Sequence, residues 1–153
     1  MRQSDIEIRP ITNVDFDAVM AIENDSFVAP WKASDLLGEI NNNQYANILV
    51  ITYQNIVVGF VDYWVTFESA TICQIAIDRA YRGNKLSSML LEEVKLDCYA
   101  KRVRSITLEV RKSNQNAIIL YKNHGFKEVL VKPNYYTNGE DAIYMSFEVK
   151  LYA

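Results

Sequence analysis

The segment 106–126 constrains the fold of this chain most, because it reads as a buried strand, a capped turn, a short helix and a glycine stop. Ser113 or Asn114 can accept hydrogen bonds from the free N–H groups of the first helical turn. Gly125 stands where helices commonly end in a left-handed residue, and Phe126 begins the next apolar run. The segment therefore predicts one strand–helix–strand unit.

The helix of this unit is predicted to turn one face inward. A carboxylate, Glu109, lies near the end of the preceding strand, and a phenol, Tyr121, lies on the helix. A strand end and the next helix can bring these groups to one cleft, and such a pair suits acyl transfer to an amine. The residues that recur at helical spacing on this face are Ala117, Leu120, Tyr121 and His124.

The order of the other elements predicts an α/β fold with a sheet of mixed direction. In the first helix, the inward candidates include Val14, Val19 and Ile22. The apolar stretch 45–65 is split at Gln54-Asn55, which favours two strands and a tight turn over a membrane span. Strands are predicted at 6–9, 46–53, 56–67, 70–78, 105–110, 126–132 and 141–149, and helices at 12–23, 34–40, 84–100 and 114–124.

Composition predicts a single globular domain over residues 1–153. Half of the residues are hydrophobic and 23% are charged, which is typical of a packed core and not of disorder. The formal charge of −3 argues against a broad nucleic-acid contact. The first residues lack the apolar core of a secretory signal, so we expect a soluble cytoplasmic protein without a membrane partner.

The cysteine and histidine content argues against a metal site. Cys73 and Cys98 are the only cysteines, and with no short spacing between them we expect small buried hydrophobic residues. His124 is the only histidine, and no cluster of possible ligands surrounds it in the sequence. We therefore expect no bound metal.

Several segments carry a family resemblance when they are taken together and in order. They are 22–27 with Pro30-Trp31, 74–78, 108–111 with Ser113-Asn114, 117–121, Gly125-Phe126, and 134–136 with 140–143. At these spacings they resemble the GNAT N-acetyltransferases, which use acetyl-coenzyme A (acetyl-CoA). The match is closer to the RimI-type subfamily of protein N-terminal acetyltransferases.

The resemblance implies a mixed, mostly antiparallel sheet of about seven strands with about four helices, splayed at the acetyl-CoA cleft. The pantetheine arm then pairs with the backbone of the strand at 72–78. The pyrophosphate lies over the turn that opens the long helix, where backbone N–H groups and the helix dipole suit an anion. The residues implied to hold the cofactor are Ile75, Ala76, Ile77, Arg82, Gly83, Asn84, Lys85, Leu86, Ser87, Ser88, Asn114 and Ala117.

The turn at 82–87 departs from the family pattern, which is usually Arg/Gln-x-x-Gly-x-Gly/Ala. Lys85 and Ser87 stand at the Gly and Gly/Ala positions of that pattern. A lysine in the left-handed conformation is disfavoured by on the order of 1 kcal/mol. Its ammonium can compensate by contacting the pyrophosphate. We expect cofactor binding to survive, at reduced strength, and a non-catalytic, partner-binding relative is the alternative.

By the same resemblance, Glu109 is the general base and Tyr121 the general acid. An α-amine titrates near ~7.8 and a lysine near ~10.4, so an α-amine needs roughly 3.5 kcal/mol less for deprotonation. Tyr121 would protonate the departing thiolate or hydrogen-bond the sulfur. Without the resemblance, Glu109 reads as a solvated carboxylate, Tyr121 as a core residue and Asn114 as a helix cap.

Two aromatic segments are implied to bind the substrate. Phe27 and Trp31 lie between the first two helices, and Tyr135 and Tyr136 lie between the last two strands. In N-terminal acetyltransferases these loops clasp the first residues of a protein or peptide, and the best-known target of the family is a ribosomal-protein N-terminal alanine. A cap over the core is the alternative for Trp31. Acetylation of a small amine or a lysine is the alternative for the chain.

Overall fold

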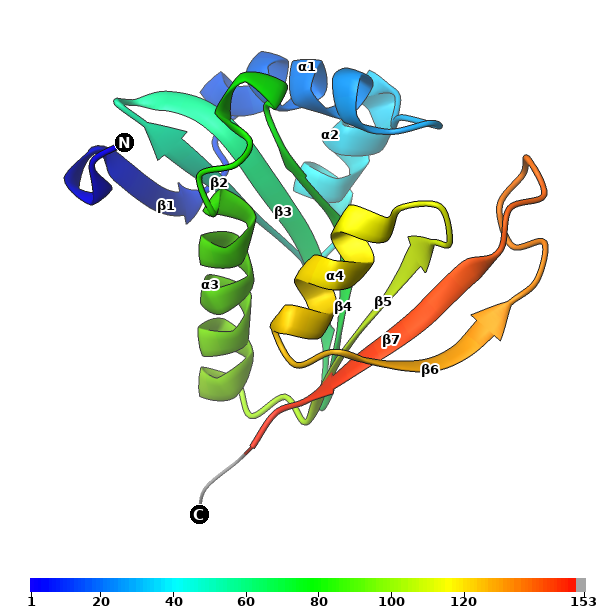
Figure 1. Cartoon of the computed structure of the whole chain (residues 1–153). Helices are drawn as coiled ribbons and strands as arrows, with labels where there is room; N and C mark the ends of the chain where they lie inside the picture. Colours follow the sequence, from blue (N-terminus) through cyan, green and yellow to red (C-terminus); the bar gives the residue numbers. More distant parts are fainter. Residues whose placement is uncertain (151–153) are drawn as a thin grey trace.

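The computed structural model describes residues 1–150 as one mixed sheet with two helices on each face (Figure 1). The sheet order is β1-β2-β3-β4-β5-β7-β6. Within these residues the strands are β1 (Ile6–Pro10), β2 (Ala46–Tyr53), β3 (Ile56–Thr66), β4 (Ser69–Ile77), β5 (Ser105–Arg111), β6 (Lys127–Lys132) and β7 (Ala142–Glu148). The helices are α1 (Phe16–Ser26), α2 (Ala33–Asn42), α3 (Leu86–Ala100) and α4 (Gln115–Asn123). The predicted architecture is confirmed.

The middle of the sheet opens between its two parallel strands. β4 and β5 pair only from Ser69–Ser105 to Ile72–Leu108, although β4 continues to Ile77 and β5 to Arg111. All other neighbouring strands are antiparallel. Because the two strands separate beyond Ile72, backbone groups on that edge of β4 face a gap and not a ladder. The predicted splay is present.

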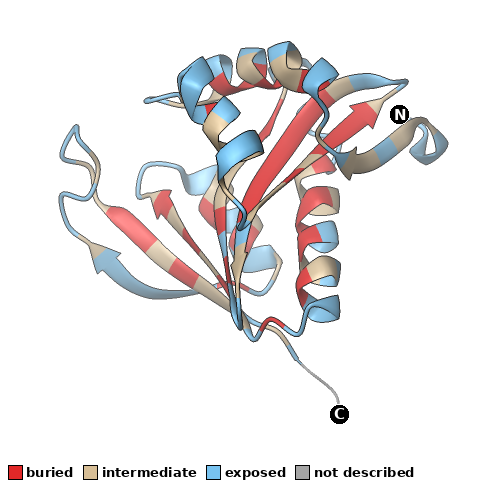
Figure 2. Ribbon diagram, turned by 180° about the vertical axis from the view of Figure 1, so that it is seen from behind, coloured by how far each residue is buried: buried red, intermediate tan, exposed pale blue. Residues whose placement is uncertain are grey.

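Two hydrophobic clusters hold the helices against opposite faces of the sheet. The larger one packs α3 and α4 through residues such as Leu90, Val94 and Ile118, and the smaller one packs α1 and α2 through Val19 and Leu36. Buried residues gather on the central strands and the inward side of α3, whereas the edge strand β6 is exposed (Figure 2). The hydrophobic core therefore packs against both faces of the sheet that contains the splay.

One predicted inward residue of the first helix is wrong. Val14 is 91% exposed, whereas Val19 and Ile22 are buried as predicted. Residues Asn13–Asp15 form a separate 3₁₀ turn, which has three residues per turn and so shifts the face that Val14 shares. The regular helix begins only at Phe16.

The apolar stretch 45–65 forms two strands, β2 and β3, because a tight turn divides it. Gln54 and Asn55 both have positive φ, 49° and 65°, as a two-residue hairpin turn requires. The stretch is therefore two antiparallel strands, as predicted. Among residues 1–150, no helix has the length and apolar character needed to cross a bilayer.

Candidate active site

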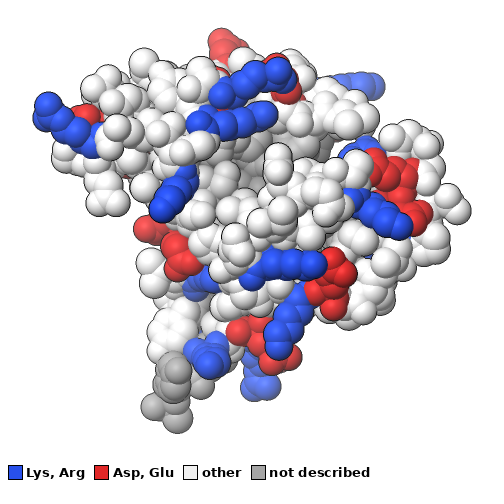
Figure 3. Space-filling view, viewed as in Figure 1, with Lys and Arg blue, Asp and Glu red and all other residues white. Residues whose placement is uncertain are grey.

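A cavity of about 680 Å³ lies where β4 and β5 separate. Figure 3 shows that this face of the molecule is hollowed and that much of the hollow is uncharged. Residues of β4, the start of α3, the end of β5 and α4 line the cavity, together with the segment after α1. The predicted site residues in its lining are Phe27, Ile75, Ala76, Ile77, Arg82, Gly83, Lys85, Leu86, Ser87, Ser88, Glu109, Asn114, Ala117, Tyr121 and Tyr136.

Three predicted site residues lie outside the lining of this cavity. The side chain of Asn84 points back and donates to the carbonyl of Tyr81 at 2.9 Å. Trp31 packs against the cluster under α1 and α2, which agrees with a structural cap. Tyr135 is 50% exposed and interacts with Glu109 from outside the cavity lining.

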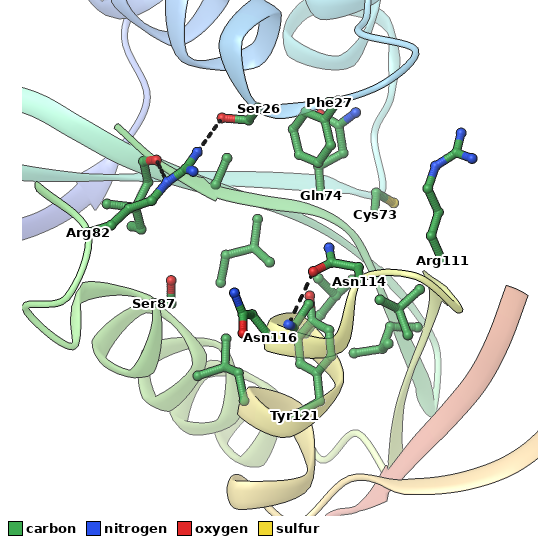
Figure 4. A pocket seen from close by; sticks show the side chains of 18 of the residues that line it. Ser26, Phe27, Cys73, Gln74, Arg82, Ser87, Arg111, Asn114, Asn116 and Tyr121 are labelled. Atoms are coloured by element: carbon green, nitrogen blue, oxygen red, sulfur yellow. Dashed lines mark hydrogen bonds between the residues drawn. The ribbon is translucent and has the colours of Figure 1, made fainter. Parts of the chain in front are cut away.

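The turn before α3 has the backbone of a tight anion-binding loop. Gly83 has φ +85°, and Lys85, at the N-cap of α3, has φ 62° and ψ 23°. Lys85 thus occupies the left-handed position that the sequence predicts for it. Arg82 braces the turn, because its Nε donates to the carbonyl of Ile77 at 3.0 Å and its guanidinium reaches Ser26 Oγ at 3.5 Å (Figure 4).

The gap-facing edge of β4 carries free backbone groups. Ile75, Ala76 and Ile77 pair with β3 on one side and have no β5 partner on the other. Ala76 and Ile77 are buried, so these groups lie on the wall of the cavity and not in open solvent. Such an edge can accept an extended ligand that carries amide groups.

Glu109 sits near the end of β5, with two partners from the β6–β7 hairpin. Lys132 Nζ lies 2.7 Å from Glu109 Oε1, and the side chains of Lys132 and Glu109 are 36% and 26% exposed. Interaction with the Glu109 carboxylate raises the pKa of Tyr135 to about 12, with burial contributing. The carboxylate is thus held at the mouth of the cavity with one oxygen paired to an ammonium.

Tyr121 reaches the cavity from α4. The residue is 6% exposed, and its ring meets Phe126 edge-on at 5.7 Å between centroids. Burial raises the pKa of Tyr121, so the phenol keeps its proton at neutral pH. Asn114 caps α4, accepting a hydrogen bond from Ala117 N at 3.2 Å, and so fixes the start of the helix that carries the phenol (Figure 4).

Ionic and hydrogen-bond contacts fasten the loop after β6 to the end of β5. The guanidinium of Arg111 lies 3.9 Å from the centroid of the Tyr136 ring and 3.1 Å from Glu140 Oε1. Glu140 Oε2 accepts from Ser113 N at 2.8 Å. These contacts hold Tyr136 in the lining of the cavity.

Sequence reasoning did not assign several residues of this region to the site. Gln74, Cys73 and Arg111 line the cavity, and Lys132 pairs with Glu109. Cys73 is half-buried and not a core residue as expected, because the β3–β4 register shifts opposite Cys73 and turns it toward the cavity, as Figure 4 shows. Cys98 is fully buried, as predicted.

One more residue, Glu23, lies close behind the cavity and was not singled out. It is 1% exposed on α1, beside the buried Val19 and Ile22. A charge among inward apolar positions of a helix is a signal that could have found it. Within residues 1–150, no group of three or more His, Cys, Asp or Glu residues is arranged to hold a metal ion.

The comparisons with known proteins agree with this geometry. Residues 16–126 match the family described as Acetyltransferase (GNAT) family. A Bacillus subtilis protein, provisionally named a ribosomal protein bS18-alanine N-acetyltransferase, is 38% identical over 90% of this chain and 92% of its own length. The ribosomal protein bS18-alanine N-acetyltransferase of Salmonella typhimurium is 31% identical over 92% of this chain and 96% of its own.

A solved structure extends the likeness to three dimensions. The crystal structure of the ribosomal-protein-S18-alanine N-acetyltransferase from Escherichia coli has a TM-score of 0.88 and 29% identity, covering 97% of this chain and 96% of that one. The family match and the curated relatives cover most of the chain, including the cavity residues from Ser26 to Tyr121. The chain therefore belongs to the GNAT family of acetyltransferases and is an acetyl-CoA-dependent N-acetyltransferase.

Proposed function

We propose that this enzyme acetylates the N-terminal α-amine of a protein, with a ribosomal protein that begins with alanine as the first candidate. The observation that carries the proposal is the cavity at the β4–β5 split, which is lined by Glu109, Tyr121 and the free edge of β4. The substrate class comes from the relatives, which are named for the alanine of ribosomal protein bS18.

The residues present fit acetyl-CoA. The free backbone groups of Ile75, Ala76 and Ile77 match an amide-bearing pantetheine arm, and the 82–85 turn matches a pyrophosphate. The first N–H groups of α3 have no intrahelical partner, and Lys85 adds a positive charge beside them. When bound, the cofactor supplies the acetyl thioester. Asn114 and Ala117 then line the same cavity from α4.

In the proposed reaction Glu109 accepts a proton from the amine, and Tyr121 donates a hydrogen bond to the leaving sulfur. A carboxylate oxygen of Glu109, directly or through a water, takes the proton of the incoming amine. The ammonium of Lys132 occupies Oε1, so the amine approaches the other oxygen or displaces Lys132. Tyr121 holds its proton at Oη because burial raises its pKa, and so it serves as a hydrogen-bond donor to the departing sulfur.

The peptide enters between the segment after α1 and the β6–β7 loop. Phe27 and Tyr136 line the cavity from these two sides, and Tyr135 stacks edge-on against Tyr136 at 5.1 Å between centroids. Aromatic walls of this kind exclude water and limit the size of the first side chain. Trp31 serves indirectly, by holding the loop that carries Phe27.

The test is thiol release from acetyl-CoA in the presence of short peptides. Peptides that begin with Ala, Ser or Met are compared with an N-terminally blocked Ala peptide that carries an internal lysine. The proposal requires release with a free α-amine and none with the blocked peptide. Release with the blocked peptide at a similar rate would overturn it in favour of lysine acetylation.

A further inference from the structure

Glu23 is a buried acid on the inner face of α1, behind the peptide side of the cavity. Its side chain is 1% exposed, and the neighbouring inward positions of the helix are the apolar Val19 and Ile22. A buried acid gives up its hydration, which costs stability unless hydrogen bonds compensate. The role of Glu23 therefore depends on the hydrogen bonds that it receives.

Both hydrogen bonds to the Glu23 carboxyl group join a loop to the sheet. Glu23 Oε2 accepts from the backbone N–H of Trp31 at 2.9 Å and from Nε2 of Gln74 at 3.1 Å. Its other oxygen, Oε1, is buried and receives no hydrogen bond from residues 1–150. Trp31 belongs to the loop 27–32 between α1 and α2, and Gln74 belongs to β4. Glu23 thus links the loop to the strand.

This link is the main polar anchor of the loop. Among the backbone groups of residues 28–31, the Trp31 N–H is the one with a hydrogen bond inside the described part of the chain. The other contacts that hold the loop are apolar, because Phe27 and Trp31 pack against the smaller hydrophobic cluster. Apolar packing is not directional, whereas a hydrogen bond is, so the bond to Glu23 fixes where the loop lies.

The link reaches β4 close to the proposed base. β4 and β5 stop pairing shortly before Gln74 and Glu109, so these two residues lie on the two sides of the split. Leu108 belongs to the cluster under α3 and α4, and alternation along β5 turns Glu109 to the opposite face, toward α1 and α2. Gln74 extends to the same face, because it binds Glu23 of α1 (Figure 4). The loop is therefore fixed to the sheet on the face that carries Glu109.

We infer that Glu23 is a positioning residue for the peptide: by binding the Trp31 N–H and the Gln74 amide together, it fixes the loop 27–32 to β4. The Phe27 wall of the peptide site is thereby held in a fixed position relative to Glu109. The inference rests on the proposed peptide site. It concerns the peptide and not acetyl-CoA, because the link lies on the α1–α2 face, whereas α3 and α4 line the cavity from the other face.

The test compares Glu23→Met with Glu23→Gln in steady-state acetylation of a free-amine peptide, with each substrate varied in turn. Methionine has a similar length and no strong acceptor, so Glu23→Met should raise the peptide KM about tenfold. The acetyl-CoA KM and kcat should stay within about twofold of wild type. Glutamine keeps an oxygen that can accept from both donors, so Glu23→Gln should stay within about twofold of wild type in every constant.

Gln74→Met tests the sheet end of the link. It leaves the bond between Glu23 and Trp31 in place, so it should raise the peptide KM by only about threefold. In the double variant with Glu23→Met it should add nothing further, because the two side chains act through one contact. Gln74→Met also keeps the inference testable if Glu23→Met folds poorly.

Tyr63→Phe is the matched control for loss of a buried hydrogen bond. Tyr63 is 2% exposed, and its Oη donates to Asp97 Oδ2 of α3 at 2.6 Å. This bond lies on the α3 face of the sheet and not at the loop. Tyr63→Phe should therefore lower the midpoint of thermal unfolding and leave the peptide KM unchanged.

Tryptophan fluorescence reports on the loop without any peptide. Trp31 and Trp64 are the only tryptophans, so Trp31 is the sole indole in a Trp64→Phe background. In that background, Glu23→Met should increase acrylamide quenching of Trp31 about twofold, because a loop without its anchor opens more often. Glu23→Gln should leave the quenching unchanged.

Four results would overturn the inference. They are an unchanged peptide KM or unchanged Trp31 quenching in Glu23→Met, a Glu23→Gln variant as impaired as Glu23→Met, effects of Glu23→Met and Gln74→Met that add in the double variant, and a Tyr63→Phe control with the same rise in peptide KM. A wild-type enzyme with no activity on any free-amine peptide refutes the proposed function instead. Quenching of Trp31 then still shows whether Glu23 holds the loop, so the two failures are distinct.

Discussion

Substitutions of Lys85 can separate the effect of its left-handed backbone from the effect of its side-chain charge. Its backbone is left-handed, with φ 62°, and its side chain is exposed at the N-terminus of α3. A glycine there would relieve the backbone strain and remove the charge, whereas a glutamine would remove only the charge. We expect Lys85→Gly to raise stability and weaken acetyl-CoA binding, and Lys85→Gln to weaken binding alone.

The expected sizes follow from the backbone conformation of Lys85 and from an assumed direct contact of its ammonium with the pyrophosphate. Left-handed backbone at a residue with a β-carbon is disfavoured by roughly 1 kcal/mol, and the greater freedom of glycine in the unfolded chain offsets part of that gain. A net gain of about 0.5 kcal/mol raises Tm by about 1–2 °C for a chain of this size. Losing one exposed charge about 4 Å from a phosphate weakens binding by about 1 kcal/mol, or roughly fivefold in Kd.

The assay is acetyl-CoA titration by calorimetry together with thermal unfolding. Arg102→Gly is the matched control, because Arg102 is also exposed and left-handed, with φ 58°, but follows the far end of α3. It should show a similar stability gain and an unchanged Kd. If Lys85→Gln binds acetyl-CoA as tightly as wild type at low salt, the ammonium does not contact the pyrophosphate and the reasoning is refuted.

Three further substitutions test other parts of the account. Glu109→Gln should lower kcat by about 10²–10⁴-fold, most at low pH where the amine is protonated, and an equal loss at every pH in a pH–rate profile would indicate a positioning role instead. Gly59→Ala should destabilise the fold by about 1–3 kcal/mol in urea unfolding, because its β-carbon would lie 2.5 Å from Ile77 Cδ1, and an unchanged midpoint would contradict that packing. Hydrogen bonding to Arg9 lowers the pKa of Asp15 to about 2, so this stabilisation is present above about pH 4 and is lost as the pH falls through 2. Arg9→Met should therefore lose about 1–2 kcal/mol at pH 7 and little at pH 2, as measured by unfolding at both pH values.

Local sequence signals correctly predicted the backbone features that flank the site. Asn114 caps α4, Gly125 has φ +90°, and Lys85 is left-handed, all as expected. Each of these features depends on backbone conformation within a few residues, where residue type has a direct physical effect. The splay between β4 and β5 came from the family resemblance and not from such signals.

Features that depend on long-range packing were not predictable in the same way. The Lys132–Glu109 pair joins β6 to β5 across 23 positions, and no local pattern marks it. Cys73 lines the cavity because of a register shift between β3 and β4, which a single alternating strand does not reveal. Asp62 is buried on β3, and in the sequence it stands out only as a polar residue in an apolar run.

The measurement that tests the central claim most directly is the location of the acetyl group on one peptide that carries both a free N-terminal alanine and an internal lysine. Mass spectrometry of fragments, after incubation with enzyme and acetyl-CoA at pH 7.5, assigns the modified nitrogen. The account predicts acetylation at the α-amine alone, with the lysine left free. Acetylation of the lysine with the α-amine left free would contradict it.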